Sequence, residues 1–193
     1  MYQFGFKKGL STGLCTSVVK RTVDYYLNRG SYVLSYTCFI DFQKALNRVN
    51  YSKLFAQMLD DGSDACFVKL LAYWYSHQTL CVYWQGLFSE KFSIGIGTRQ
   101  GRVLSPYLFT RYVRPLISAL SSSRLGCNIG GLIVNMLTYA DDMVLLAPSW
   151  YALQSLLLER LCTELDIVCN RPTIKMLCMI FRQRIWIGAR AQF

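Results

Sequence analysis

The chain has 193 residues, and 21 basic against 11 acidic side chains leave a formal net charge of +10. With 53% hydrophobic and 15% aromatic residues, the composition is that of a globular protein and excludes the disordered, collagen-like and low-complexity classes. The length suits one domain, with at most an incomplete neighbour. No apolar run reaches the roughly 18 residues that a membrane-spanning helix needs, so we expect no membrane partner.

The first ten residues contain Lys7 and Lys8 and lack the apolar core of a signal peptide. We therefore expect the protein to stay inside the cell, in the nucleus or the cytoplasm, and not to be secreted. Eight cysteines are widely spaced without a C-x-x-C pair, and most stand in apolar segments. The sequence thus predicts buried free thiols and no disulfides. With His77 as the only histidine, a zinc site is poorly supported.

The hydrophobic pattern predicts a mixture of helices and strands. Helices are expected over residues 11–27, from Asn50 to about Gly62, over 65–75, from the loop at 97–101 to the serines at 121–123, and over 150–168. Strands are expected over residues 32–41, 79–83, 91–96, 136–140 and 143–147. Ser11 or Thr12 and Asn50 are of the residue types that cap helix N-termini.

Three of the eleven acids stand where an unpaired carboxylate would be costly. Asp41 ends the strand at 32–41, and Asp141 and Asp142 separate two short apolar strands, which predicts that this pair lies at a hairpin tip. Adjacent carboxylates repel each other and attract hard cations such as Mg²⁺. Two such ions about 3.5–4 Å apart can activate a 3′-hydroxyl and stabilise a leaving pyrophosphate. An Asp-Asp pair without further context is more often a simple polar turn, so the surrounding motifs must distinguish a turn from a metal site.

Four segments follow a family pattern in order along the chain. They are Q-F-G-F-K-K-G-L-S-T at 3–12, F-I-D-F-Q-K-A-L-N-R-V at 39–49, G-T-R-Q-G-R-V-L-S-P at 97–106 and Y-A-D-D at 139–142. They resemble, in the same order, the Q-x-G-F-R-x-x-x-S-T, F-x-D-x-x-K-A-F-D-x-V, G-x-x-Q-G-x-x-L-S-P and Y-A-D-D motifs of reverse transcriptases from non-LTR (LINE-type, jockey-like) retrotransposons. Together the four segments span most of the chain.

The resemblance implies an α+β polymerase palm, which is an antiparallel sheet that carries the Asp-Asp hairpin and is backed by helices. Residues 1–35 are then expected to form a partial fingers segment and 36–185 the palm, with 186–193 unassigned, all within one reverse transcriptase domain. Thumb and endonuclease regions normally belong to the same polypeptide, and neither is recognised in this sequence. We therefore expect a retrotransposon remnant in which the thumb is missing.

The same resemblance implies an RNA-directed DNA polymerase that joins dNTPs to the 3′-hydroxyl of a DNA primer on an RNA template, with two Mg²⁺ ions. Asp41, Asp141 and Asp142 would be its catalytic residues and metal ligands. The residues expected to bind the nucleotide or the template are Leu46, Arg99, Gln100, Gly101 and Lys175. In keeping with the net charge, the candidates for phosphate contacts are Lys7, Lys8, Arg99, Arg102 and Arg111.

Two segments of the chain depart from the family pattern. Leu46 replaces an aromatic residue that in the family lies beneath the deoxyribose, which implies altered discrimination between dNTPs and rNTPs. Around Lys175, Pro172 and Met176 replace the Asn and Thr of a motif written N-x-x-K-T-x-x-M-x-F. Two alternatives stay open: an inactive palm-like fold that at most binds nucleic acid, and a protein-interaction domain whose aspartates are polar turn residues. An interaction domain should not bind Mg²⁺, whereas an intact acid triad should.

Overall fold

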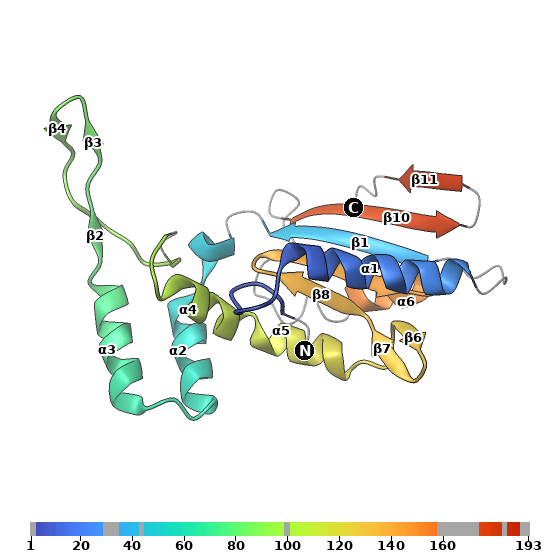
Figure 1. Cartoon of the computed structure of the whole chain (residues 1–193). Helices are drawn as coiled ribbons and strands as arrows, with labels where there is room; N and C mark the ends of the chain where they lie inside the picture. The colour runs from blue at the N-terminus through green and yellow to red at the C-terminus, as the bar shows by residue number, and fades with distance from the viewer. Residues whose placement is uncertain are drawn as a thin grey trace. The chain divides into compact units, whose positions relative to one another are not determined.

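The structure is a computed structural model that describes residues 3–28, 35–42, 45–98, 101–157, 174–182 and 185–189 (Figure 1). The chain divides into two compact units. The sheet unit consists of Met1–Gln43 with Val113–Phe193, and the helical unit is Lys44–Tyr112. These limits differ from the fingers and palm ranges expected from the sequence, 1–35 and 36–185, and that functional division stays a prediction.

In the described part of the sheet unit, five antiparallel strands form one sheet, in the order β11-β10-β1-β9-β8. They are β1 (Ser35–Phe42), β8 (Met136–Tyr139), β9 (Asp142–Ala147), β10 (Ile174–Arg182) and β11 (Ile185–Ala189). The central strand is β1, between β9 and β10. The antiparallel sheet with its Asp-Asp hairpin, predicted from the family resemblance, is therefore present.

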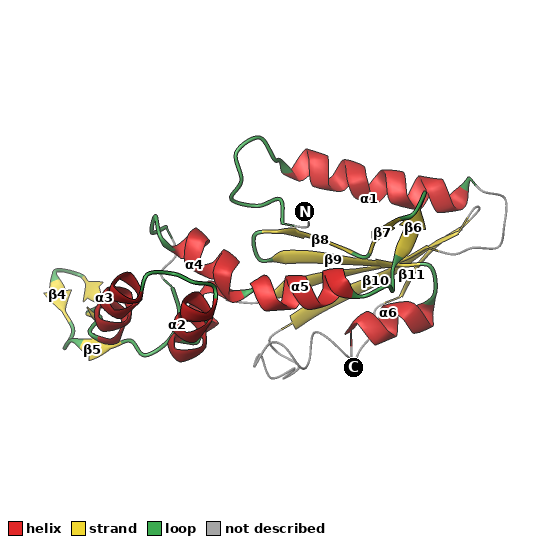
Figure 2. Ribbon diagram, turned by 90° about the horizontal axis from the view of Figure 1, so that it is seen from below, coloured by secondary structure: helices red, strands yellow, loops and turns green. Residues whose placement is uncertain are grey.

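Helices cover both faces of this sheet, with α1 (Thr12–Leu27) on one face and α6 (Trp150–Leu156) on the other (Figure 2). Beneath α1, a core of buried side chains includes Cys15, Leu137 and Leu146. Burial of such apolar surface is the main force that holds helix and sheet together. A further helix among the described residues of the unit is α5 (Arg114–Ser122), whose Leu116 and Leu120 are buried.

The predicted helix starts agree with the structure where local capping chemistry defines them. Ser11 Oγ accepts a hydrogen bond from Leu14 N at 3.3 Å, which confirms Ser11 as the N-cap of α1. The helix expected over 150–168 begins as predicted at Trp150, and its part beyond residue 157 lies outside the described residues.

The helical unit contains three helices among its described residues, α2 (Tyr51–Asp60), α3 (Ala65–Ser76) and α4 (Ser105–Tyr112), and a short 3-10 helix, η1 (Ala45–Arg48). Asn50 caps α2 as predicted, because its Oδ1 accepts from Lys53 N at 3.1 Å. The predicted strand pair is a hairpin in which β2 (Thr79–Leu80) pairs with β5 (Phe92–Ser93), and β3 (Tyr83–Trp84) pairs with β4 (Leu87–Phe88).

One local prediction was wrong, and one hairpin was missed. The single helix expected up to the serines at 121–123 is broken into α4 and α5, because Pro115 has no N–H to donate and its ring clashes with the carbonyl four residues earlier. The hairpin of β6 (Cys127–Ile129) and β7 (Leu132–Val134) was not foreseen. Its two-residue turn is Gly130-Gly131, and both glycines have positive φ, a short hairpin signal that the sequence does contain.

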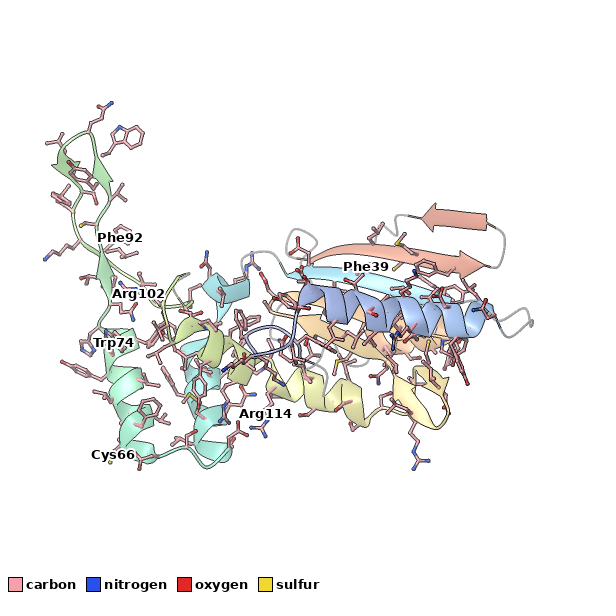
Figure 3. The ribbon with its side chains drawn as sticks, viewed as in Figure 1. Phe39, Cys66, Trp74, Phe92, Arg102 and Arg114 are labelled. Carbon is pink, nitrogen blue, oxygen red and sulfur yellow. The ribbon has the colours of Figure 1, made fainter. Side chains whose placement is uncertain are left out.

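All six cysteines that the structure describes are free, as predicted. Burial holds for only part of this set: Cys15, Cys38, Cys127 and Cys178 are buried, whereas Cys66 and Cys81 are exposed. Cys66 stands in the first turn of α3 (Figure 3), on a side of the helix that faces solvent. No described helix is both long and apolar enough to cross a lipid bilayer.

Candidate functional site

The sheet brings together two of the three acids selected from the sequence. Asp41 and Asp142 are direct partners in the antiparallel pairing of β1 with β9. Residues in such positions have Cα atoms about 4.5–5.5 Å apart, and their side chains lie on the same face. Asp141 lies in the adjacent turn, between Tyr139 and Asp142, which are themselves paired across the β8–β9 hairpin. The hairpin tip is thus Ala140-Asp141, and Asp142 already belongs to β9.

The three carboxylates influence one another electrostatically. Partial burial raises the pKa of Asp142, and repulsion from Asp141 and then from Asp41 raises it further. Asp41 and Asp142 are exposed and Asp141 is half-buried, so all three can be reached by a ligand. This end of the sheet therefore carries concentrated negative charge on a protein whose net charge is +10.

The donor set fits a hard divalent cation, because carboxylate oxygens are the ligands that Mg²⁺ prefers and a cation would relieve the repulsion at Asp142. Within the described residues, no group of three or more His, Cys, Asp or Glu side chains is arranged to hold a metal ion by itself. Mg²⁺ usually retains water and takes substrate phosphate oxygens as further ligands. The acids are therefore chemically suited to the ion, and a complete coordination sphere would need ligands from outside the chain.

The turn that carries Asp141 is held by the N-terminal segment, a contact that the sequence analysis missed. The Gln3 side chain forms two hydrogen bonds with the backbone of Ala140, from Nε2 to the carbonyl and from the Ala140 N–H to Oε1, each at 3.2 Å. Gly5 N also donates to Gln3 Oε1 at 2.8 Å, and Phe4 N donates to the Thr138 carbonyl at 2.8 Å. We call residues 3–5 the N-terminal clamp.

Close packing within the N-terminal clamp requires glycine at position 5. A Cβ there would lie 2.2 Å from the backbone nitrogen of Ala140. Ala140 itself has φ +58, a left-handed conformation that L residues with a side chain rarely adopt. The Gln3 bonds therefore hold a strained turn, and the Q-x-G-F part of the first family motif was the signal that could have pointed to this role.

Register also relates Lys175 to the acids. In the pairing of β1 with β10, the Cα of Lys175 is the partner of Asp41, on the side of β1 opposite to Asp142. The side chain of Lys175 lies outside the described part of the structure. Its predicted role at the nucleotide therefore stays a prediction.

The other selected residues belong to the helical unit. Leu46 is half-buried in η1, and its carbonyl accepts from Thr98 N at 2.6 Å. Gly97 has φ +87, and a Cβ there would lie 2.5 Å from the Asn47 carbonyl oxygen. The start of the G-T-R-Q-G segment is thus packed directly against the turn that carries Leu46. Gly101 has φ +77 with open space around it, and Arg99 and Gln100 lie outside the described residues.

The candidate phosphate contacts differ in their surroundings. Lys7, Lys8 and Arg102 are exposed. Arg111 instead forms an ion pair with Asp61, with 2.9 Å between Nη1 and Oδ2. Because that carboxylate already neutralises it, Arg111 is a weaker candidate than the sequence suggested.

Comparison with known proteins identifies the family. Residues 1–166 match the family model described as reverse transcriptase (RNA-dependent DNA polymerase). This chain belongs to the reverse transcriptase family. It is 30% identical over 122 residues to the retrovirus-related Pol polyprotein from the type-2 retrotransposable element R2DM of Drosophila melanogaster. The predicted resemblance to reverse transcriptases of non-LTR retrotransposons is therefore confirmed.

Solved structures support the fold of this reverse transcriptase domain. Telomerase from Candida tropicalis in complex with a fragment of telomeric RNA aligns with 98% of the chain, with a TM-score of 0.64 and 11% identity. The apo telomerase of the same organism, truncated from its C-terminal domain, aligns with 99% of the chain, with a TM-score of 0.61 and 13% identity. These likenesses show an α+β, palm-like reverse transcriptase fold, as predicted.

The chain spans only part of each of these proteins. It covers 11% of the retrotransposon polyprotein, and 30% and 37% of the two telomerase chains.

Proposed function

We propose that this reverse transcriptase domain is an RNA-directed DNA polymerase that transfers nucleotides from dNTPs to the 3′-hydroxyl of a DNA primer on an RNA template. The observation that carries the proposal is the direct pairing of Asp41 with Asp142, beside Asp141 in the adjacent turn. Membership of the reverse transcriptase family supports it. The similarity to a retrotransposon Pol polyprotein and to a telomerase with bound telomeric RNA adds further support.

In this function Asp41, Asp141 and Asp142 would hold two Mg²⁺ ions, which when bound supply activation of the primer hydroxyl and charge neutralisation at the pyrophosphate. The chain contributes fixed positions for these carboxylates, since Asp41 and Asp142 stand on paired strands and the N-terminal clamp holds the turn at Asp141. Rigid placement matters because the reacting atoms must approach to about 3–3.5 Å, and a displacement of about 1 Å can cost about 10²-fold in rate.

We assign the remaining roles on the family pattern. Leu46 would contact the sugar of the incoming nucleotide, and Arg99, Gln100 and Gly101 would contact the template or the nucleotide. Lys175, across the sheet register from Asp41, would assist the departure of pyrophosphate. The LINE-type and jockey-like affiliation is proposed on the four motifs.

We also propose that the protein works inside the cell, in the nucleus or the cytoplasm. Free thiols at all six described cysteines suit a reducing compartment.

The test is primer extension on an RNA template with Mg²⁺, comparing the wild type with Asp141→Ala and Asp142→Ala. Asp60→Ala is a matched control, because Asp60 is an exposed acid of α2 in the other unit. We expect extension by the wild type and by the control, and none by the two site variants. Equal extension by all four proteins would contradict the metal assignment.

A second experiment measures Mg²⁺ binding independently of catalysis. Mg²⁺ should raise the melting temperature of the wild type and of Asp60→Ala, and should have no effect on Asp142→Ala, because a ligand that binds only the folded state stabilises it. A wild type that neither extends a primer nor responds to Mg²⁺ would favour the inactive palm-like fold or the protein-interaction domain.

A further inference from the structure

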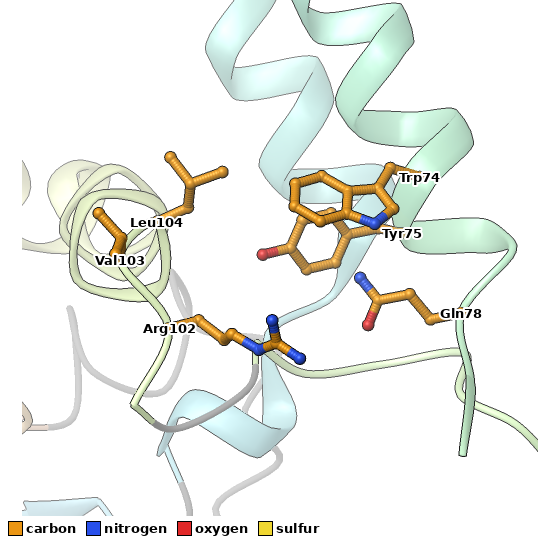
Figure 4. Close-up of a pocket in the computed structure, with 6 residues that line it drawn as sticks. All are labelled: Trp74, Tyr75, Gln78, Arg102, Val103 and Leu104. Carbon is orange, nitrogen blue, oxygen red and sulfur yellow. The ribbon is translucent and has the colours of Figure 1, made fainter.

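A cavity of about 340 Å³ opens in the helical unit, between the end of α3 and the segment that leads into α4 (Figure 4). Its lining consists of Trp74, Tyr75, Gln78, Arg102, Val103 and Leu104. We call it the Trp74 pocket. Ligand pockets in proteins start at about 300 Å³, so there is room for one flat ring system with its substituents.

The polar groups of the Trp74 pocket point to a specific kind of ligand. Gln78 Oε1 is buried and has no hydrogen-bond partner in the described structure. Such an orphaned acceptor is costly unless a donor reaches it, so it indicates a ligand that donates a hydrogen bond. Arg102 supplies positive charge, and no acid is among the six lining residues.

The aromatic side chains of the pocket add a further requirement. Trp74 is 52% exposed, so part of its indole is available for contact with a ligand. In Figure 4 the Arg102 and Gln78 side chains extend toward the same space, beside the Trp74 and Tyr75 rings. A ligand for this space should have an aromatic face for the indole, a hydrogen-bond donor for Gln78 and an anionic group for Arg102.

An unpaired nucleotide meets all three requirements. Every base has a face that can stack on an aromatic side chain, and such stacking is the usual way in which proteins hold single strands. The exocyclic amino groups and ring N–H groups of bases are donors for an amide oxygen, and guanidinium groups pair well with phosphate. An acidic peptide could pair with Arg102 and donate a backbone N–H to Gln78 Oε1, but its acidic side chains offer no aromatic face to the Trp74 indole. An apolar ligand would leave both Arg102 and Gln78 without a partner.

We propose that the Trp74 pocket binds one unpaired base of single-stranded RNA, with the base stacked on Trp74, hydrogen-bonded to Gln78 and followed by a phosphate at Arg102. The proposal rests on the proposed function, since the RNA would be the template strand. It adds a binding site to the motif-derived assignments, because Trp74, Tyr75 and Gln78 lie outside the four motif segments, whereas Arg102, Val103 and Leu104 belong to the segment at 97–106. Within that segment Arg102 directly follows Gly101, which would keep the pocket in line with the expected path of the strand.

The experiment measures the binding of a short, unstructured, fluorescently labelled RNA by anisotropy over a series of salt concentrations. Trp74→Ala should weaken binding by about 5- to 150-fold, the usual effect of losing one stacked base. Arg102→Gln should lower the slope of log affinity against log salt by about 0.7, the contribution of one phosphate contact on a single strand. Tyr73→Ala is the matched control, because this neighbouring aromatic is 65% exposed and does not line the pocket; it should bind as the wild type does.

Two apolar variants, one aromatic and one aliphatic, distinguish a loss of base stacking from a loss of folding. Trp74→Phe should retain more affinity than Trp74→Leu, because only the former keeps an aromatic face. Equal affinities for these two variants, or wild-type affinity of Trp74→Ala, would overturn the proposal. Competition by free dNTPs as strong as that by RNA would assign the pocket to the incoming nucleotide and would likewise overturn it.

Failure of the pocket and failure of the polymerase give different results. RNA binding that depends on Trp74, without primer extension, would support the pocket and refute the proposed function. Primer extension that is lost in Asp142→Ala, together with RNA binding that is unchanged in Trp74→Ala, would support the proposed function and refute the pocket.

Discussion

Replacing Gly5 by alanine tests whether the N-terminal clamp positions the turn that carries Asp141. The new Cβ would lie 2.2 Å from Ala140 N and 2.9 Å from Ala140 Cα, whereas real Cβ contacts essentially never fall below 3.0 Å. Both obstructing atoms are backbone, so no side-chain rotation can relieve the clash. The turn must therefore move by a large fraction of an ångström, and Asp141, the next residue, must move with it.

Two magnitudes follow from this displacement. Overpacking of a buried site typically costs about 1–3 kcal/mol, so the free energy of unfolding should fall by about that amount. A shift of about 1 Å in a reacting group can cost about 10²-fold in rate, so kcat for single-nucleotide extension should fall by about that factor. KM should change little, because the clamp contacts the turn and not the substrate.

Urea denaturation and single-nucleotide extension kinetics measure the two effects. Gly13→Ala is the matched control, because Gly13 is in the first turn of α1 and a Cβ there would meet Ser11 Oγ at an ordinary contact distance of 3.7 Å. Alanine has a higher helix propensity than glycine, so this control should be as stable as the wild type or more so, and should keep its kcat. Wild-type stability and kcat in Gly5→Ala would refute the reasoning.

Three further predictions concern single side chains. Asp142→Asn removes one of two like charges that face each other across β1 and β9, so without Mg²⁺ it should raise the free energy of unfolding by roughly 0.2–1 kcal/mol, measured in urea, while extension is lost. If Leu46 allows the site to accept ribonucleotides, Leu46→Phe should increase the preference for dNTPs over rNTPs in extension assays. An unchanged preference would contradict this role of Leu46. Burial raises the pKa of the Cys127 thiol to about 12, so at neutral pH Cys66 and Cys81, which are exposed, should be alkylated far faster than Cys127; peptide mass mapping that found equal rates would contradict this.

Local chemistry explains which features could be predicted from the sequence. Helix starts at Ser11 and Asn50 depend on a side chain that bonds the backbone three residues later, so a short stretch of sequence is enough. The break at Pro115 obeys an equally local rule, but the apolar spacing continues through it and favoured one long helix. The family motifs identified the acids, because each motif is a contiguous string.

The tertiary structure alone determines which residues of these motifs become neighbours. Alternating strands such as β1 can pair with several neighbours, and a slip of one residue in register would turn every side chain to the other face; only the folded sheet makes Asp142 the partner of Asp41. The N-terminal clamp joins Gln3 to Ala140, 137 positions away in sequence, and the Trp74 pocket joins α3 to the segment before α4. The sequence by itself therefore determined the family, the acids and most local elements, whereas the neighbours of the acids and the new pocket depend on long-range packing, which no contiguous motif encodes.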